Sequence, residues 1–221
     1  MFDIFKNRIP DPVNSETLKE ILNKHISPVL SKIGLEWDGN NQWISPSENT
    51  TRKIFKHQVG KGLMGTFIWG ISYDFLPIIS GGKIILQRTF KSAKPHLFEN
   101  SITTNAFGNT KSDLQNGITT TWGEKECNKS VSELILKKEQ EIFDWFNNAS
   151  TFQGSLDIAN RQMTNNNYNT HWPNPKYVAA FLKAKIGDKE NGLALLEQVQ
   201  NERLNIEQEL FEKIEKRLNE L

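Results

Sequence analysis

The chain has 221 residues, enough for one substantial hydrophobic core, and its 27 Lys and Arg residues nearly balance its 26 Asp and Glu residues. A formal net charge of +1 excludes a whole-molecule electrostatic field that would attract nucleic acid or an anionic membrane. The single cysteine, Cys127, cannot form an intramolecular disulfide, and no apolar run reaches the roughly 20 residues that span a bilayer, so we expect a cytoplasmic protein.

The first predicted element is a helix over residues 15–33. Its apolar side chains recur at steps of three and four residues and form one face: Leu18, Ile21, Leu22, Ile26, Val29, Leu30 and Ile33. Asn14 or Ser15 can cap the first turn, and Gly34 supplies the left-handed residue that ends many helices. We expect this helix to cover one face of the sheet that follows it.

The next stretches predict four antiparallel strands in meander order. They are "LEWDGNNQWIS", "TRKIFKHQVGKG", "LMGTFIWGISYDFLPII" and "GGKIILQRTFK", each rich in β-branched or aromatic residues and bounded by turn residues. Gly62, Gly65 and Gly70 lie among strand-forming residues, so they indicate turns or bulges and not a phosphate-binding loop.

A polar stretch from residue 91 to residue 129 predicts a long loop with one short strand at residues 118–122. Loops of this length within a domain are usually functional or disordered. We therefore expect partner contacts there.

Helices are predicted again in the C-terminal part. Ser130 and Glu133 form a capping box for the first of them, and a shorter helix is expected over residues 155–163. Asn174 and Pro175 begin another helix, which ends at Gly187, and Asp188 caps the last one. This helical hairpin resembles one tetratricopeptide unit, but no second copy occurs at a period near 34 residues, so we expect it to close the domain.

The last helix is expected to continue for about 30 residues, as one long terminal helix. Its apolar stripe permits self-association into a homodimer through Ile206, Leu210, Ile214 and Leu218. Docking of the same stripe within the chain is the alternative, and the sequence does not decide between the two.

These elements define an α+β protein, in which an N-terminal helix packs on an antiparallel sheet and C-terminal helices follow. We expect two parts: residues 1–128 with the helix, the sheet and the long loop, and residues 129–221 with the helical part packed on it.

No catalytic residue, metal ligand or cofactor site is predicted. The sequence contains no nucleophile elbow, and its four histidines, His25, His57, His96 and His171, do not have metal-ligand spacing. An enzyme whose site forms only on folding remains an alternative, with the residues His57, Asp74, Glu99 and His171.

A weak single-stranded nucleic-acid site is a second alternative, because basic and aromatic residues alternate in the sheet region. The basic residues are Lys53, Lys56, His57, Lys61, Lys83, Arg88, Lys91 and Lys94, and the aromatic ones are Phe55, Trp69, Phe90 and Phe98. Strand alternation favours the simpler interpretation, in which the lysines face solvent and the aromatic rings face the core.

Protein binding is the preferred hypothesis. The strand from Leu63 to Ile79 can offer a sheet edge with Trp69 and Tyr73 as exposed anchors. The candidate binding residues are His57, Trp69, Tyr73, Asp74 and Arg88.

Four stretches in this order, "LKEILNKHISPVLSKIGLEW", "FKHQVGKGLMGTFIWGISYDF", "EIFDWF" and "AKIGDKENGLALLEQV", resemble a bacterial family known as domain of unknown function 4304. The resemblance covers Thr17 to Val199. It implies an immunity or interaction protein of inter-bacterial toxin systems and supplies no catalytic residues. The sequence therefore predicts a non-enzymatic protein-binding module of immunity or regulatory type.

Overall fold

The structure, a computed structural model, describes residues 11–59, 64–101, 117–120, 123–165, 168, 173–204 and 207–221. The chain forms two compact units. Unit 1 contains Met1–Ile44, Phe55–Ile68 and Glu99–Glu141, and unit 2 contains Ser45–Ile54, Trp69–Phe98 and Ile142–Leu221. The two units alternate along the chain, whereas the sequence predicted a single boundary after residue 128.

The N-terminal helix, α1 (Ser15–Leu30), begins as predicted in unit 1. The side chain of Asn14 accepts a hydrogen bond from the Thr17 backbone N–H at 2.9 Å and so caps the first turn. A short 3-10 helix, η1 (Ser31–Ile33), follows, and Gly34 ends it with a φ of 78°, in the left-handed region that favours glycine.

The main sheet is antiparallel and has the strand order β1-β2-β3-β4-β7. Its strands are β1 (Glu36–Trp37), β2 (Gln42–Ile44), β3 (Thr51–Val59), β4 (Met64–Tyr73) and β7 (Leu97–Asn100). A further short strand, β8 (Ile118–Thr119), pairs with β4. The first four strands neighbour one another in chain order, so the predicted α+β class and its meander are confirmed.

The last predicted strand, within "GGKIILQRTFK", does not join the main sheet. It forms β6 (Lys83–Leu86), which pairs with β5 (Pro77–Ser80) in a separate two-stranded sheet. Gly81 and Gly82 close this hairpin with φ values of 58° and 70°, as the favoured two-residue turn requires. β7 takes the place beside β4, so the expectation of a loop at residues 97–100 is wrong.

Three aromatic rings form the centre of unit 1. The ring centroids of Trp43 and Phe55 lie 5.8 Å apart, and those of Phe55 and Phe67 lie 5.0 Å apart. The indole N–H of Trp43 donates to the Ser27 hydroxyl of α1 at 2.7 Å. All these side chains belong to unit 1. The contact between Trp43 and Ser27 confirms that α1 covers the face of the sheet that carries Trp43.

The next helix, α3 (Gly123–Asn148), begins in unit 1 and ends in unit 2. It starts before the predicted capping box, so Ser130 lies inside the helix. The Ser130 hydroxyl donates to the Cys127 carbonyl at 2.9 Å instead of capping a helix end.

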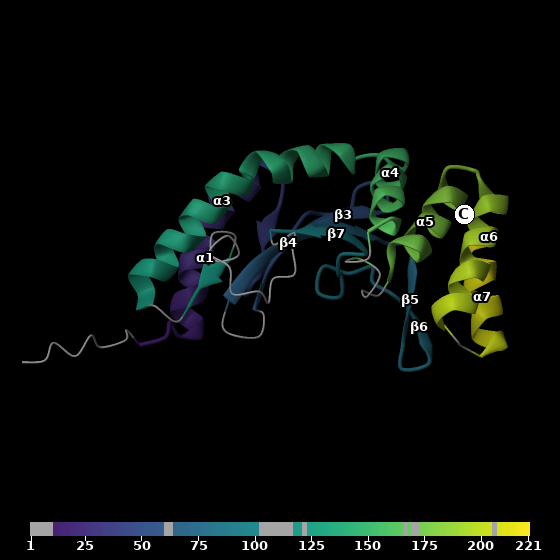
Figure 1. Cartoon of the computed structure of the whole chain (residues 1–221), viewed down its shortest axis with the longest axis horizontal. Helices are drawn as coiled ribbons and strands as arrows, with labels where there is room; N and C mark the ends of the chain where they lie inside the picture. Colours follow the sequence, from purple (N-terminus) through teal and green to yellow (C-terminus); the bar gives the residue numbers. More distant parts are fainter. Residues whose placement is uncertain are drawn as a thin grey trace, which may run out of the picture. The chain divides into compact units, whose positions relative to one another are not determined.

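The remaining helices belong to unit 2. They are α4 (Phe152–Met163), α5 (Pro175–Lys185), α6 (Lys189–Val199) and α7 (Gln208–Asn219), of which the last three lie side by side (Figure 1). The Asn174 side chain caps α5 by accepting from the Tyr177 N–H at 2.8 Å, as predicted. A side chain at Gly192 would place its Cβ 2.7 Å from the Ala180 carbonyl, so this glycine permits the close approach of α6 to α5. In the described part of the chain, no helix combines the length and the apolar character that crossing a membrane requires.

The expected single long terminal helix is wrong. A π-helix, η2 (Gln200–Leu204), follows α6, and α7 is a separate helix that packs against α6. The Lys189 ammonium at the start of α6 donates to the Asn219 carbonyl at the end of α7, at 2.7 Å. Ile214 and Leu218 are fully buried, so the self-association prediction is wrong for these two residues. Leu210 is half-buried, and Ile206 lies outside the described residues.

Candidate functional site

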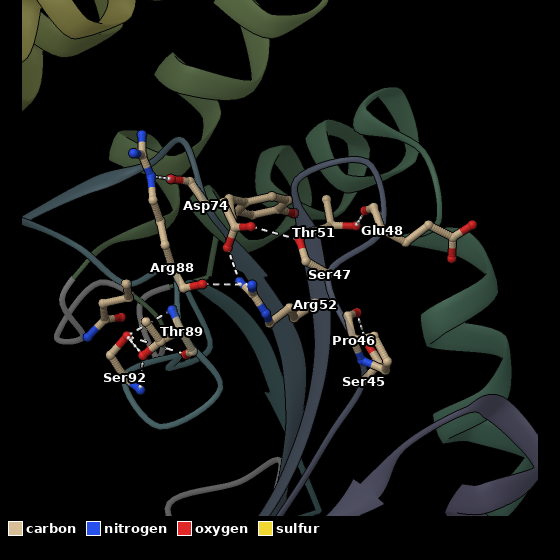
Figure 2. Close-up of polar contacts among 12 residues, drawn as sticks. Ser45, Pro46, Ser47, Glu48, Thr51, Arg52, Asp74, Arg88, Thr89 and Ser92 are labelled. Atoms are coloured by element: carbon tan, nitrogen blue, oxygen red, sulfur yellow. Dashed lines mark hydrogen bonds and ion pairs between the residues drawn. The ribbon is translucent and has the colours of Figure 1, made fainter.

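Asp74, which follows the last residue of β4, is the centre of a polar network in unit 2 (Figure 2). Its carboxylate accepts hydrogen bonds from the Arg52 guanidinium and, at 2.7 Å, from the Ser47 hydroxyl. The Arg88 Nε donates to the Asp74 backbone carbonyl at 2.9 Å, and Arg52 donates to the Arg88 carbonyl at 2.7 Å. We call Ser47, Arg52, Asp74 and Arg88 the Asp74 network.

The network fixes three segments of the chain relative to one another within unit 2. The Arg52 and Asp74 side chains are 11% and 17% exposed, so their ion pair is largely shielded from solvent. Two guanidinium groups and one carboxylate leave the network with a formal positive charge. Because Arg52 neutralises Asp74, the charge of Arg88 is the one available to a ligand.

A strained turn borders this network. Asn49 and Thr50 have φ values of 49° and 65°, in the left-handed region, and the turn is closed by two hydrogen bonds between Glu48 and Thr51, each of 2.9 Å. A β-branched residue such as Thr50 rarely adopts this conformation, which costs on the order of 1–3 kcal/mol. The Asp74 N–H donates to the Thr50 carbonyl at 2.8 Å, so the network helps to hold the turn.

The chain beyond Arg88 forms a second turn whose tip is exposed. Thr89 and Ser92 close it, since the Thr89 N–H donates to the Ser92 hydroxyl and the Ser92 N–H donates to the Thr89 carbonyl, both at 3.1 Å. Phe90 lies in this turn and is 39% exposed, and Lys91 is exposed beside it. We call residues 83–94 the basic segment.

Three of the five predicted binding residues are in the core. Trp69 and Tyr73 have no exposed surface, and His57 is 2% exposed. The expectation that Trp69 and Tyr73 are exposed anchors on a sheet edge is wrong, because β4 lies between β3 and β7 and is covered on both faces. Asp74 and Arg88 are brought together by the fold, whereas Arg52, which joins them, was missed by the sequence analysis.

Burial also sets the titration of His57, on β3, and of His96, which precedes β7. Desolvation lowers the pKa of His57 to about 4, and its ring packs against Gly65. Desolvation likewise lowers the pKa of His96 to about 3. The His96 Nδ1 accepts from the Tyr73 N–H at 3.0 Å, so the proton of the neutral ring is on Nε2, where Gln87 accepts it at 3.2 Å. Both rings are therefore neutral, structural groups near neutral pH.

The residues of the alternative enzyme site are described only in part, and two of them have hydrogen-bond partners. His171 lies outside them, and the Asp74 carboxylate is occupied by Arg52 and Ser47. The carboxylate of the half-buried Glu99 accepts from the Asn100 N–H at 3.2 Å. Within the described part of the chain, no group of three or more His, Cys, Asp or Glu residues could hold a metal ion.

Most of the aromatic rings predicted for the alternative nucleic-acid site are not exposed for stacking on bases. Phe55 and Trp69 are fully buried, and Phe98 is half-buried. Of the four aromatic residues predicted to alternate with the lysines, Phe90 alone is exposed. Lys61 lies outside the described residues.

The described residues thus define a structural class: an α+β protein with a meander sheet, in which Arg52 and Asp74, a shielded ion pair, hold an exposed basic segment. No protein-family model, no curated protein and no solved structure matches the chain. The resemblance to domain of unknown function 4304 stays a prediction.

Proposed function

We propose that this chain is a non-enzymatic protein-binding module, of immunity or regulatory type, which contacts its partner through the basic segment. The observation that carries the proposal is the exposure of Ile85 and Phe90, at 40% and 39%, within this segment. Aromatic side chains and arginine are enriched at protein interfaces, and the segment presents both as Phe90 and Arg88.

The way in which the segment is held supports the same function. Arg52 and Asp74 bind its backbone and its Arg88 side chain, and Thr89 and Ser92 close the turn around Phe90. A surface that is ordered before binding loses less conformational entropy when a partner docks. The strained turn at Thr50 also supports this function, because strained backbone conformations cluster at functional sites.

Two further features agree with this proposal. The one cysteine, Cys127, is a buried free thiol, which suits a reducing compartment such as the cytoplasm. The immunity-type assignment rests on the pattern resemblance given above, and a protein partner in the same cell is what that assignment requires.

The experiment is affinity capture from a lysate of the native host, followed by calorimetry with the purified partner. Phe90→Ser and Ile85→Ser should each weaken binding by about tenfold, because each removes an apolar contact. Leu136→Ser is the matched control, since Leu136 is an exposed apolar residue, 64% exposed, on α3 and outside the basic segment.

Point variants are preferable to a chain that ends at Val199. Such a chain would lack α7 and with it the buried side chains of Phe211, Ile214 and Leu218. A partner whose affinity is reduced by the Phe90 and Ile85 substitutions and unchanged by the Leu136 substitution supports the proposal. Equal affinities for all three variants, or no partner at stoichiometric yield, contradicts it.

A further inference from the structure

Arg88 provides the most specific recognition chemistry on the basic segment. We propose that its guanidinium is a carboxylate-binding site, which anchors an acidic segment of a partner protein while Phe90 contacts an apolar side chain of the same segment. The inference rests on the proposed function and specifies the chemistry of the partner.

One hydrogen bond orients the Arg88 guanidinium, and another holds the Arg88 backbone. Its Nε donates to the Asp74 carbonyl, and its own carbonyl accepts from Arg52. The two terminal nitrogens point away from Asp74 (Figure 2), and no hydrogen bond among the described residues engages them. A guanidinium held in this way presents two parallel N–H donors, the geometry that a carboxylate matches in a bidentate pair.

The charge around Arg88 favours an acidic ligand. Residues 75–98 contain four basic side chains, Lys83, Arg88, Lys91 and Lys94, and no Asp or Glu. All four are exposed. The nearest preceding acid, Asp74, is already neutralised by Arg52. The excess of positive charge along residues 75–98 favours an acidic partner over a basic one.

A protein carboxylate fits better than a nucleic-acid phosphate. Binding of single strands needs successive aromatic faces on which bases stack, and the buried Phe55 and Trp69 cannot supply them. Phe90 is a single exposed ring, two residues after Arg88 in the chain. This pair suits one acidic and one apolar side chain of a peptide.

The test is a titration of the isotopically labelled full chain, followed by NMR, with three probes. They are a short peptide of alternating glutamate and leucine, its lysine-leucine counterpart and a thymidine oligonucleotide. The acidic peptide should shift the amide signals of residues 83–94 and the Nε–H signal of Arg88. The basic peptide should cause no shift there.

Arg88→Gln should reduce affinity for the acidic peptide by about tenfold. Arg88→Lys keeps the charge but loses the two parallel N–H donors, so its affinity should lie between those of the native chain and Arg88→Gln. Lys129→Gln is the matched control, because it removes one positive charge from an exposed surface side chain outside the segment. Thermal unfolding checks that each variant folds. If Arg88→Gln does not fold, Lys91→Gln replaces it as the test variant, and its affinity for the acidic peptide should fall by about twofold to fivefold.

Equal affinity of the Arg88→Gln and Lys129→Gln variants overturns the inference, as does the absence of shifts in residues 83–94 with the acidic peptide. Shifts with the oligonucleotide in place of the peptide overturn it in favour of phosphate binding. If the captured partner depends on Phe90 and is unaffected by Arg88→Gln, the carboxylate site fails while the proposed function stands.

Discussion

Thr50 carries the clearest backbone strain among the described residues. Its φ of 65° places a β-branched residue in the left-handed region, and hydrogen bonds from the flanking residues and from Asp74 hold it there. Glycine adopts this conformation without a steric cost. The strain at Thr50 therefore belongs to the side chain and not to the turn itself.

Thr50→Gly should raise the free energy of unfolding by about 1 kcal/mol, because relief of strain exceeds the added entropy of the unfolded chain. Urea denaturation of the variant and of the native chain measures the difference. Asn49→Gly is the comparison, and its effect should be smaller, since asparagine tolerates a positive φ better than threonine does. A destabilised Thr50→Gly variant would show that the hydroxyl or methyl group makes a contact worth more than the strain.

The sequence identified two members of the Asp74 network and missed the residue that joins them. Asp74 and Arg88 were among the candidate binding residues, whereas Arg52 lies in a run of polar residues at the start of β3 and carries no local signal. Trp69 and Tyr73 were misplaced for a related reason. Alternation puts them on one face of β4, yet it does not reveal that both faces of the strand are covered.

At the scale of elements, the helix starts capped by Asn14 and Asn174 were predictable, and the break in the last helix was not. Residues 200–207 contain neither glycine nor proline, so nothing local ends the helical pattern. Folding back buries Phe211, Ile214 and Leu218, which an extended helix would leave in water. Each such side chain contributes about 1.5–3 kcal/mol, and this tertiary gain outweighs helical continuity.

The docking of α7 leads to a prediction on stability. Ile214→Ala and Leu218→Ala should each lower the free energy of unfolding by about 2–4 kcal/mol, because both side chains are fully buried within the chain. Leu210→Ala, at a half-buried position, should cost less. Thermal unfolding at several protein concentrations measures the stability of each variant and its dependence on concentration. A melting temperature that rises with concentration would instead favour an intermolecular role for the same stripe.

The packing of β7 on β4 depends on a glycine. A Cβ at Gly70 would collide with the Leu97 carbonyl and with Phe98, so Gly70→Ala should destabilise the chain by at least about 2 kcal/mol. Gly82→Ala is the control, because its φ of 70° is unfavourable for alanine while its surroundings are open. Its cost should be about 1 kcal/mol.

Hydrogen exchange separates these two effects. Gly70→Ala should speed exchange of the Ser101 and His96 amides, which donate at 2.8 Å to the Phe67 and Ile71 carbonyls of β4. Gly82→Ala should leave them unchanged. Equal costs and equal exchange rates for the two variants would mean that β7 shifts without penalty to accept a side chain.

For the whole molecule, buried neutral histidines set the response to acid. The pKa values of His57 and His96 are lowered by desolvation to about 4 and about 3, whereas a histidine in the unfolded chain titrates near 6.5. The unfolded state therefore binds more protons below pH 6.5. The stability that neutral histidines contribute is complete above this pH and is lost as the pH falls toward the folded values.

Between pH 7.5 and pH 5.5 each buried histidine should remove about 1.4 kcal/mol from the free energy of unfolding. The pKa values of Asp188 and Glu209 are lowered by hydrogen bonds with Lys183 and Lys213, so their stabilisation is lost only at more acidic pH. The difference between each histidine variant and the native chain therefore reports the substituted histidine. His57→Gln and His96→Gln should each be less stable at pH 7.5, yet each should lose about 1.4 kcal/mol less than the native chain on acidification. Urea titrations at the two pH values give this difference. An unchanged loss in both variants would mean that neither ring is excluded from protonation in the fold, and that acid acts on the chain through other groups.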